Sequence, residues 1–338
     1  MTTFTNQLAP AAGARHTIQA TRRAMLSAAL GCARRCVAVL ALMAMSCGSL
    51  WAGPLADGAR LKAAVEAIST HPRIKDVGRD KLKATTEFVL GNMLFVLLHE
   101  AAHGLISDLG LPVLGREEDA ADQFATVMML AMKTEFTHRT LVNSAKSWLI
   151  SDRRARDEGE VTTYYDNHGL DLQRAYNIIC LMVGSDSEQF EDLANEVNLP
   201  DDRQETCVFD YSNAQWSWEQ ALKPHRRAPG QKRTTYQIAY GKAEGELGIV
   251  EQVFRVTGIM ERVADRLVDL YVWKKPFTIE VLTCGSSGAK WVGPDHKITL
   301  CYELAEEFMQ LYKLHGEDPL ASLSPPAGNR LGAPSGFR

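Results

Sequence analysis

Two histidines and a glutamate, His99, Glu100 and His103, have the types and spacing of a metal-dependent hydrolytic site. On a helix, residues four apart project from the same face, so His99 and His103 can each offer a ring nitrogen to one metal ion. Glu100 is placed to take a proton from a water molecule held at that metal. The HExxH pattern therefore predicts zinc chemistry. The alternative is that all three are core side chains satisfied by hydrogen bonds.

A second acidic motif follows the histidines along the chain. Glu118 is the expected third ligand, which gives two histidines, one glutamate and an open position, the pattern of a catalytic zinc site. Asp122 shares the helical face of Glu118 and could accept the free N–H of a ligand histidine. The Gly-Leu-Pro sequence at 110–112 predicts a turn between two helices. An antiparallel return would bring Glu118 to the histidine pair, so we expect one Zn²⁺ per chain.

The elements that position these residues can be predicted from periodicity. The run 88–98 is apolar almost all round, which is typical of a buried helix, and it leads directly into the histidines. Strand-like runs bounded by Gly, Pro and Asp lie in the later part of the chain, at 277–283 and 297–300. The predicted fold class is α+β, mostly helical, with a small C-terminal sheet. Further helices are expected over 133–149, 172–183, 216–222, 246–271 and 302–314.

The segment 95–125, with its HExxH and following ExxAD sequence, resembles the gluzincin metallopeptidases. More narrowly, it is similar to a family of exported bacterial metallopeptidases whose function is unassigned. The resemblance extends, more loosely, to 168–177, to Cys180 and Cys207, and to 284–304. It implies a zinc peptidase fold acting on a peptide or protein substrate, without specifying which one.

A peptidase of this kind needs a donor aimed at the oxyanion beside the metal. His168 is the first choice, because it precedes the helix that the resemblance includes. Arg174, Tyr176 and Tyr302 are the rivals. We therefore expect Glu100 and His168 to be the catalytic side chains.

The order of the elements departs from the zincin pattern, in which the sheet that walls the active site precedes the HExxH helix. No strand signal precedes this helix, and the strand candidates at 277–300 resemble a segment that usually comes before it. We therefore expect a permuted arrangement, in which the strand containing Ala289 and Trp291 is the edge that binds an extended peptide by β-addition. An ordinary hairpin without a substrate role is the alternative.

The first 52 residues have the composition of an export signal. The Arg22-Arg23 pair resembles a twin-arginine signal, an apolar run at 37–45 follows, and small residues precede a plausible cleavage point. The run is short for a bilayer span, so we expect no stable membrane span after cleavage. The export signal predicts a periplasmic or secreted protein. Whether Sec or Tat carries it stays open. A retained anchor and lipid attachment at Cys47 are the alternatives.

Removal of the signal leaves four cysteines in the mature chain. In an oxidising compartment these allow three pairings. Proximity along the chain favours Cys180–Cys207 and Cys284–Cys301. Four free thiols or a second metal site are the alternatives.

Length and composition agree with an ordinary globular enzyme. The chain has 338 residues, 46% of them hydrophobic, and a net charge of −4 without a basic stripe, so we expect no nucleic-acid partner. One domain is expected over 53–316, with a candidate internal boundary at 224–233 and a disordered tail over 317–338. The prediction is an exported zinc metallopeptidase. The alternatives are a non-catalytic periplasmic binding or assembly protein that zinc stabilises, and a zinc hydrolase of non-peptide amides.

Overall fold

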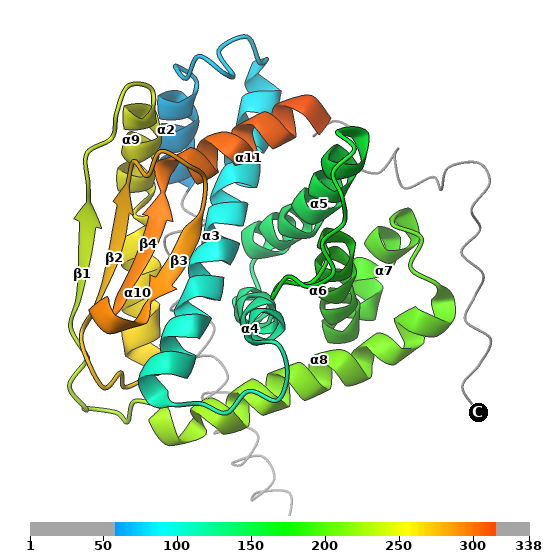
Figure 1. The fold of residues 1–338 in the computed structure, drawn as a ribbon, viewed down its shortest axis with the longest axis vertical. Helices are drawn as coiled ribbons and strands as arrows, with labels where there is room; N and C mark the ends of the chain where they lie inside the picture. Colours follow the sequence, from blue (N-terminus) through cyan, green and yellow to red (C-terminus); the bar gives the residue numbers. More distant parts are fainter. Residues whose placement is uncertain (1–57, 316–338) are drawn as a thin grey trace, which may run out of the picture. The chain divides into compact units, whose positions relative to one another are not determined.

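The computed structural model describes residues 58–315, which form an α+β fold of helices and one small sheet (Figure 1). The predicted export signal at 1–52 and the predicted tail at 317–338 lie outside these residues. The fold class therefore agrees with the prediction. In chain order the elements are α2 Gly58–Ile68, α3 Arg79–Leu109, α4 Glu117–Ala131, α5 Glu135–Asp157, α6 Asp171–Ser185, α7 Ser187–Glu196, α8 Asp201–Leu222, β1 Tyr236–Tyr240, α9 Leu247–Thr257, α10 Ile259–Leu270, β2 Phe277–Leu282, β3 Ala289–Val292, β4 Lys297–Cys301 and α11 Tyr302–His315.

Helix α3 is the centre of the fold and carries the HExxH sequence. It lies between the sheet on one side and α4, α5 and α6 on the other (Figure 1). By length and composition this helix could cross a membrane, but 89% of its apolar window is buried inside the protein. It ends at Gly110, whose φ of 71° lets the chain turn and return as α4. The predicted buried helix and the turn after it are thus both present.

The sheet has the strand order β1-β2-β4-β3. Strands β1, β2 and β4 are parallel, whereas β3 runs antiparallel to β4 and forms the edge nearest α3 (Figure 1). Strands β2 and β4 confirm the strand predictions. Strand β1 was missed, because none of its five residues is fully buried and its Tyr-Gln-Ile-Ala-Tyr sequence lacks a clear alternation.

A glycine allows the sheet to approach the metal-motif helix closely. A Cβ atom at Gly104 would lie 3.1 Å from the ring of Trp273 and 3.2 Å from that of Trp291. One turn further along α3, the carboxylate of Asp108 accepts a hydrogen bond of 2.6 Å from the backbone N–H of Lys274. The part of the chain from Trp273 to Trp291, more than 160 residues after the end of α3, therefore packs directly against it.

Three helix predictions were wrong in extent. The helix expected over 133–149 runs over Glu135–Asp157 as α5. The expected helix over 246–271 is broken at Gly258, whose φ of 62° ends α9 and begins α10. The expected short helix over 216–222 is only the last part of α8. Along α8 the buried residues are few, namely Cys207, Ala214, Trp218 and Leu222. Such a narrow stripe gives a weak periodic signal, which explains the error.

Both predicted disulfide pairings are present in the structure. Cys180–Cys207 joins α6 to α8, and Cys284–Cys301 joins the segment before β3 to the end of β4. Helices α6 and α8 also approach each other closely, since a Cβ atom at Gly184 would lie 2.1 Å from the carbonyl oxygen of Cys207. Only glycine fits at that position without moving the backbone.

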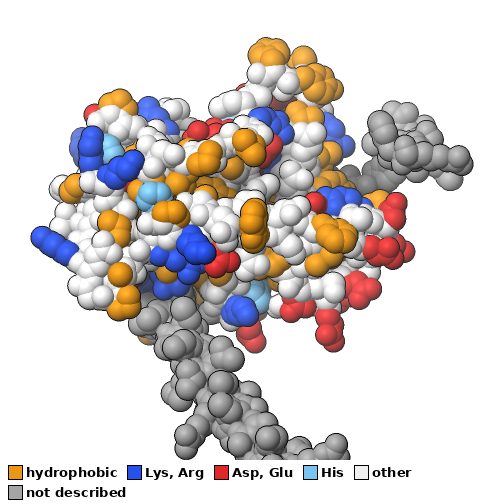
Figure 2. All heavy atoms as spheres, turned by 90° about the horizontal axis from the view of Figure 1, so that it is seen from below, with side chains coloured by type: hydrophobic (Ala, Val, Ile, Leu, Met, Phe, Trp, Pro, Cys, Tyr) orange, Lys and Arg blue, Asp and Glu red, His pale blue; other side chains and the backbone are white. Residues whose placement is uncertain are grey.

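Charge is unevenly distributed over the face seen in Figure 2. Acidic side chains gather on the side where α7 and the beginning of α8 lie, whereas basic side chains lie mainly toward the sheet. Apolar side chains emerge between them in small groups. Acidic and basic side chains are therefore segregated on this face.

Candidate metal centre

The return from α3 to α4 brings the predicted ligands together. The Nε2 atoms of His99 and His103 lie 3.1 Å from each other, and 3.1 and 3.2 Å respectively from Oε2 of Glu118. Helix α4 begins with Glu117, Glu118 and Asp119, and negative charge is favourable in the first turn of a helix. The three side chains predicted as ligands thus meet at one point.

Each of the two histidines is oriented by a carboxylate on its other ring nitrogen. Nδ1 of His99 lies 2.8 Å from Oδ1 of Asp122, and Nδ1 of His103 lies 2.7 Å from Oε1 of Glu117. A carboxylate at Nδ1 accepts the N–H there and leaves the lone pair of Nε2 for a metal. Asp122 therefore lies where the sequence predicted. The matching role of Glu117 was not predicted.

Asp122 is held in turn by Arg174. Nε and Nη2 of Arg174 donate to the two carboxylate oxygens of Asp122, both at 2.7 Å. The guanidinium is buried and lies 3.6 Å from the ring centre of Trp148. This engaged side chain positions Asp122 and, through it, His99. Burial raises the pKa of Asp122, but its hydrogen bonds to His99 and Arg174 outweigh burial and lower the pKa below its usual value.

The other rivals of His168 are engaged elsewhere. The hydroxyl of Tyr176 donates to the carbonyl of Val197 at 2.8 Å, and that of Tyr302 donates to the carbonyl of Gly241 at 3.3 Å. His168 itself lies at the site: its Nε2 is 3.0 Å from Oε2 of Glu118. Of the candidates for a donor near the metal, only His168 touches a predicted ligand among the described contacts.

Glu100, the predicted base, is buried beside the sheet. Glu100 is 7% exposed. Burial raises the pKa of its carboxyl group above the usual value, and the nearby histidines and the backbone N–H of Trp291 offset part of this effect. Glu100 therefore faces β3, on the side of α3 that Gly104 also occupies.

The hydrogen-bond pattern of β3 decides which of its backbone groups face outward. The carbonyl of Gly288 accepts from the N–H of Cys301 at 3.0 Å. Gly288, just before β3, and Cys301, at the end of β4, therefore form a hydrogen-bonded pair. In antiparallel ladders such pairs alternate with non-hydrogen-bonded ones. Ala289 and Trp291 therefore turn their N–H and C=O groups to the outer edge, where the N–H of Trp291 meets Glu100.

Protonation is strongly perturbed where the ligands meet. Burial alone would lower the pKa of His103, but hydrogen bonds to Glu118 and Glu117 outweigh it and raise the pKa to about 9. For His99, too, burial lowers the pKa and is outweighed by its carboxylate partners. Burial raises the pKa of Glu118, whereas hydrogen bonds to the histidines carry it far below its usual value.

The donor set fits a metal ion. Imidazole nitrogens and a carboxylate oxygen are ligands that zinc takes in proteins, and here they converge from two packed helices. Carboxylates on Nδ1 are the usual outer partners of such ligands. His99, His103 and Glu118 are therefore the residues that would hold the ion.

Replacing Glu118 by Ala should weaken zinc binding by more than about 100-fold. Loss of an outer hydrogen-bond partner of a ligand lowers metal affinity by about 10- to 100-fold, and loss of a direct ligand should lower it more. Competition with a chromophoric chelator measures the change. Glu251→Ala is the control, since that carboxylate lies on α9 and pairs with Arg255, away from the site. Unchanged affinity in Glu118→Ala would remove this residue from the ligand set.

Zinc binding at pH 7 should release at least one proton per ion. With a pKa of about 9, His103 is protonated in the metal-free protein at pH 7, and a ligand histidine must give up its Nε2 proton. The release should decline as the pH rises through about 9, because the proton is then already gone. Calorimetric titrations in buffers of different ionisation enthalpy measure it. Metal binding without proton uptake by the buffer at pH 7 would contradict the prediction.

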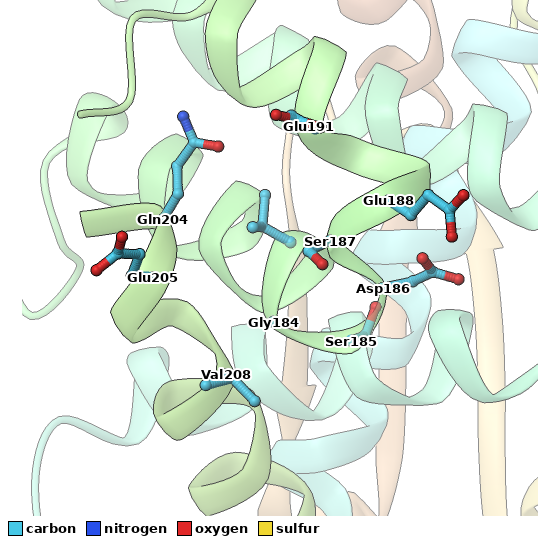
Figure 3. Close-up of a pocket in the computed structure, with 10 residues that line it drawn as sticks. Gly184, Ser185, Asp186, Ser187, Glu188, Glu191, Gln204, Glu205 and Val208 are labelled. Carbon is cyan, nitrogen blue, oxygen red and sulfur yellow. The ribbon is translucent and has the colours of Figure 1, made fainter. Parts of the chain in front are cut away.

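A separate hollow of about 760 Å³ lies where the end of α6, α7 and α8 meet. Its acidic side chains, Asp186, Glu188, Glu191 and Glu205, lie around it rather than converging on a point (Figure 3). None of its lining residues belongs to the candidate metal centre. The convergent donors between α3 and α4 are thus distinct from this hollow.

Fold and site together define a mostly helical α+β protein with a candidate metal centre on the packed helices α3 and α4. Residues 58–222 match the model of a family described as "Putative metallopeptidase". This match supports a metal-dependent peptidase, and with it a peptide or protein substrate. It ends with α8, so the sheet lies outside the matched part. No match was found among curated proteins or among solved structures.

Proposed function

We propose that this protein is an exported zinc peptidase in which His99, His103 and Glu118 hold the ion and Glu100 is the general base. The observation that carries the proposal is the convergence of two carboxylate-oriented Nε2 atoms on Glu118, beside a buried glutamate. Zinc, when bound, supplies a Lewis acid that activates water for attack on an acyl carbon.

The protein's own groups would handle the proton and the substrate. Glu100 takes the proton of the attacking water and passes it to the leaving amine. Its raised pKa, caused by burial, suits a group that must both accept and return a proton. His168, whose Nε2 lies 3.0 Å from Oε2 of Glu118, would donate to the developing oxyanion.

The outer edge of β3 is the proposed binding place for the peptide backbone. Ala289 and Trp291 turn their main-chain groups outward there, and Trp291 lies beside Glu100. A strand edge pairs with an extended peptide through main-chain hydrogen bonds, which favours peptides over other amides. Export is supported by the two disulfides, since such bonds persist in oxidising compartments.

One observation favours a second function, a non-catalytic protein that zinc stabilises. His168 adds a further nitrogen beside Glu118, and four protein ligands are typical of a structural site. Removal of zinc distinguishes the two functions. A peptidase should lose cleavage of a broad peptide library but keep cooperative melting, because α3 is buried by apolar packing. Cleavage absent in the zinc-loaded protein, together with melting of the metal-free protein at room temperature, would favour the second function.

A further inference from the structure

We propose that His168 is a fourth protein ligand of the metal in the resting protein, and that it must leave before a substrate can be attacked. The proposal deepens the proposed function and rests on it for the identity of the metal centre. His168 lies on the segment 158–170, between α5 and α6, whereas the other ligands lie on helices.

The first argument is that the ring of His168 has the same two kinds of contact as the rings of the two helical histidines. Its Nδ1 lies 3.0 Å from Oδ1 of Asp166, and its Nε2 lies 3.0 Å from Oε2 of Glu118. Nδ1 of His99 and of His103 is likewise paired with a carboxylate, and their Nε2 atoms reach the same oxygen at 3.1 and 3.2 Å. Each of the three imidazoles thus has a carboxylate on Nδ1 and its Nε2 within 3.2 Å of the same oxygen of Glu118, and carboxylate-oriented Nε2 atoms are typical of metal-ligating histidines. The ligand atoms of His99, Glu118 and His168 also lie within 4.8 Å of one another.

The second argument is that local contacts fix His168 in this position. The carboxylate of Asp166 also accepts the backbone N–H of His168, at 2.8 Å, and Arg116 donates to the backbone carbonyl of His168 at 3.2 Å. The adjacent Asn167 donates to the second oxygen of Glu118 at 3.3 Å. The segment therefore contacts the ligand carboxylate at two successive side chains. A lone surface ion pair would need none of these supports.

The third argument concerns which ligand could leave. The side chains of His99, His103 and Glu118 are 7%, 14% and 15% exposed, and each is fixed on a helix. The side chain of His168 is 43% exposed and belongs to a segment without regular structure. An irregular, exposed segment is easier to displace than a packed helix. Departure of His168 would open the fourth position and leave its ring beside the site, where it could donate to substrate.

X-ray absorption at the zinc edge of the full-length, zinc-loaded protein tests the ligand set directly. We expect three imidazole ligands in the wild type and two in His168→Ala. Zinc affinity, measured by chelator competition, should fall by more than about tenfold in His168→Ala. His138→Ala is the matched control, because His138 lies on α5 and pairs with Gln189, away from the site. It should keep three imidazoles and full affinity.

Two imidazoles in the wild type would overturn the proposal, whatever the variant does. This measurement needs no variant, so a His168→Ala protein that failed to fold would not obscure the answer. It also separates the two proposals. Three imidazoles without any peptide cleavage would leave the ligand assignment standing and refute the peptidase, whereas two imidazoles with cleavage would do the reverse.

Discussion

Replacing Glu100 by Gln should reduce peptide hydrolysis by about 10²- to 10⁴-fold, the contribution typical of a positioned general base. The amide keeps the shape of the side chain but cannot accept a proton from water. Because Glu100 is not a predicted ligand, zinc content should stay at one ion per chain. The turnover rate of the zinc-loaded protein on a cleaved library peptide, the metal content and the melting temperature together measure the effect.

Glu87→Gln is the matched control for this change. Glu87 is also buried on α3, at 8% exposure, but it pairs with Arg139 and not with the metal site. It should retain wild-type turnover. Equal turnover of the Glu100→Gln variant and the wild type would exclude Glu100 as the base.

Ending the chain after Arg227 should prevent folding altogether. The truncation removes the whole sheet and α9, α10 and α11, although it keeps all the residues that match the metallopeptidase family. It would expose the face of α3 around Gly104, against which Trp273 and Trp291 pack. Exposing a face of the most buried helix costs more than a domain's marginal stability.

Loss of cooperative melting, followed by circular dichroism, is the expected result for the truncated chain. A matched truncation after residue 316 should melt like the full-length protein, since it removes only the predicted tail. A soluble fragment ending at Arg227 that binds zinc and melts cooperatively would show that the sheet is an appended module.

The parts predicted from sequence were those governed by local spacing. Helical periodicity placed His99, His103, Glu118 and Asp122 on matching faces, and the helix–turn–helix return followed from Gly110. The strands β2 and β4 were evident because β-branched and aromatic residues are concentrated in them.

The parts that were missed depend on contacts distant in sequence. Nothing near Arg174 indicates that it holds Asp122, because the pair forms only when α6 packs beside α4. Asp166 orients His168 through a turn that has no regular pattern. The role of Glu117 at His103 was missed as well. A carboxylate beside a ligand in sequence is a signal that could have suggested its role at His103.

The position of the sheet in the chain also has a consequence for synthesis. Helix α3 leaves the ribosome long before β3, which lies about 180 residues later. A nascent chain at that stage therefore holds the metal motif without the strand edge that faces Glu100. If the edge is needed to hold a peptide, cleaving capacity arises only when the last part of the chain has emerged. The order of the elements along the chain would thus delay any peptide cleavage until synthesis is nearly complete.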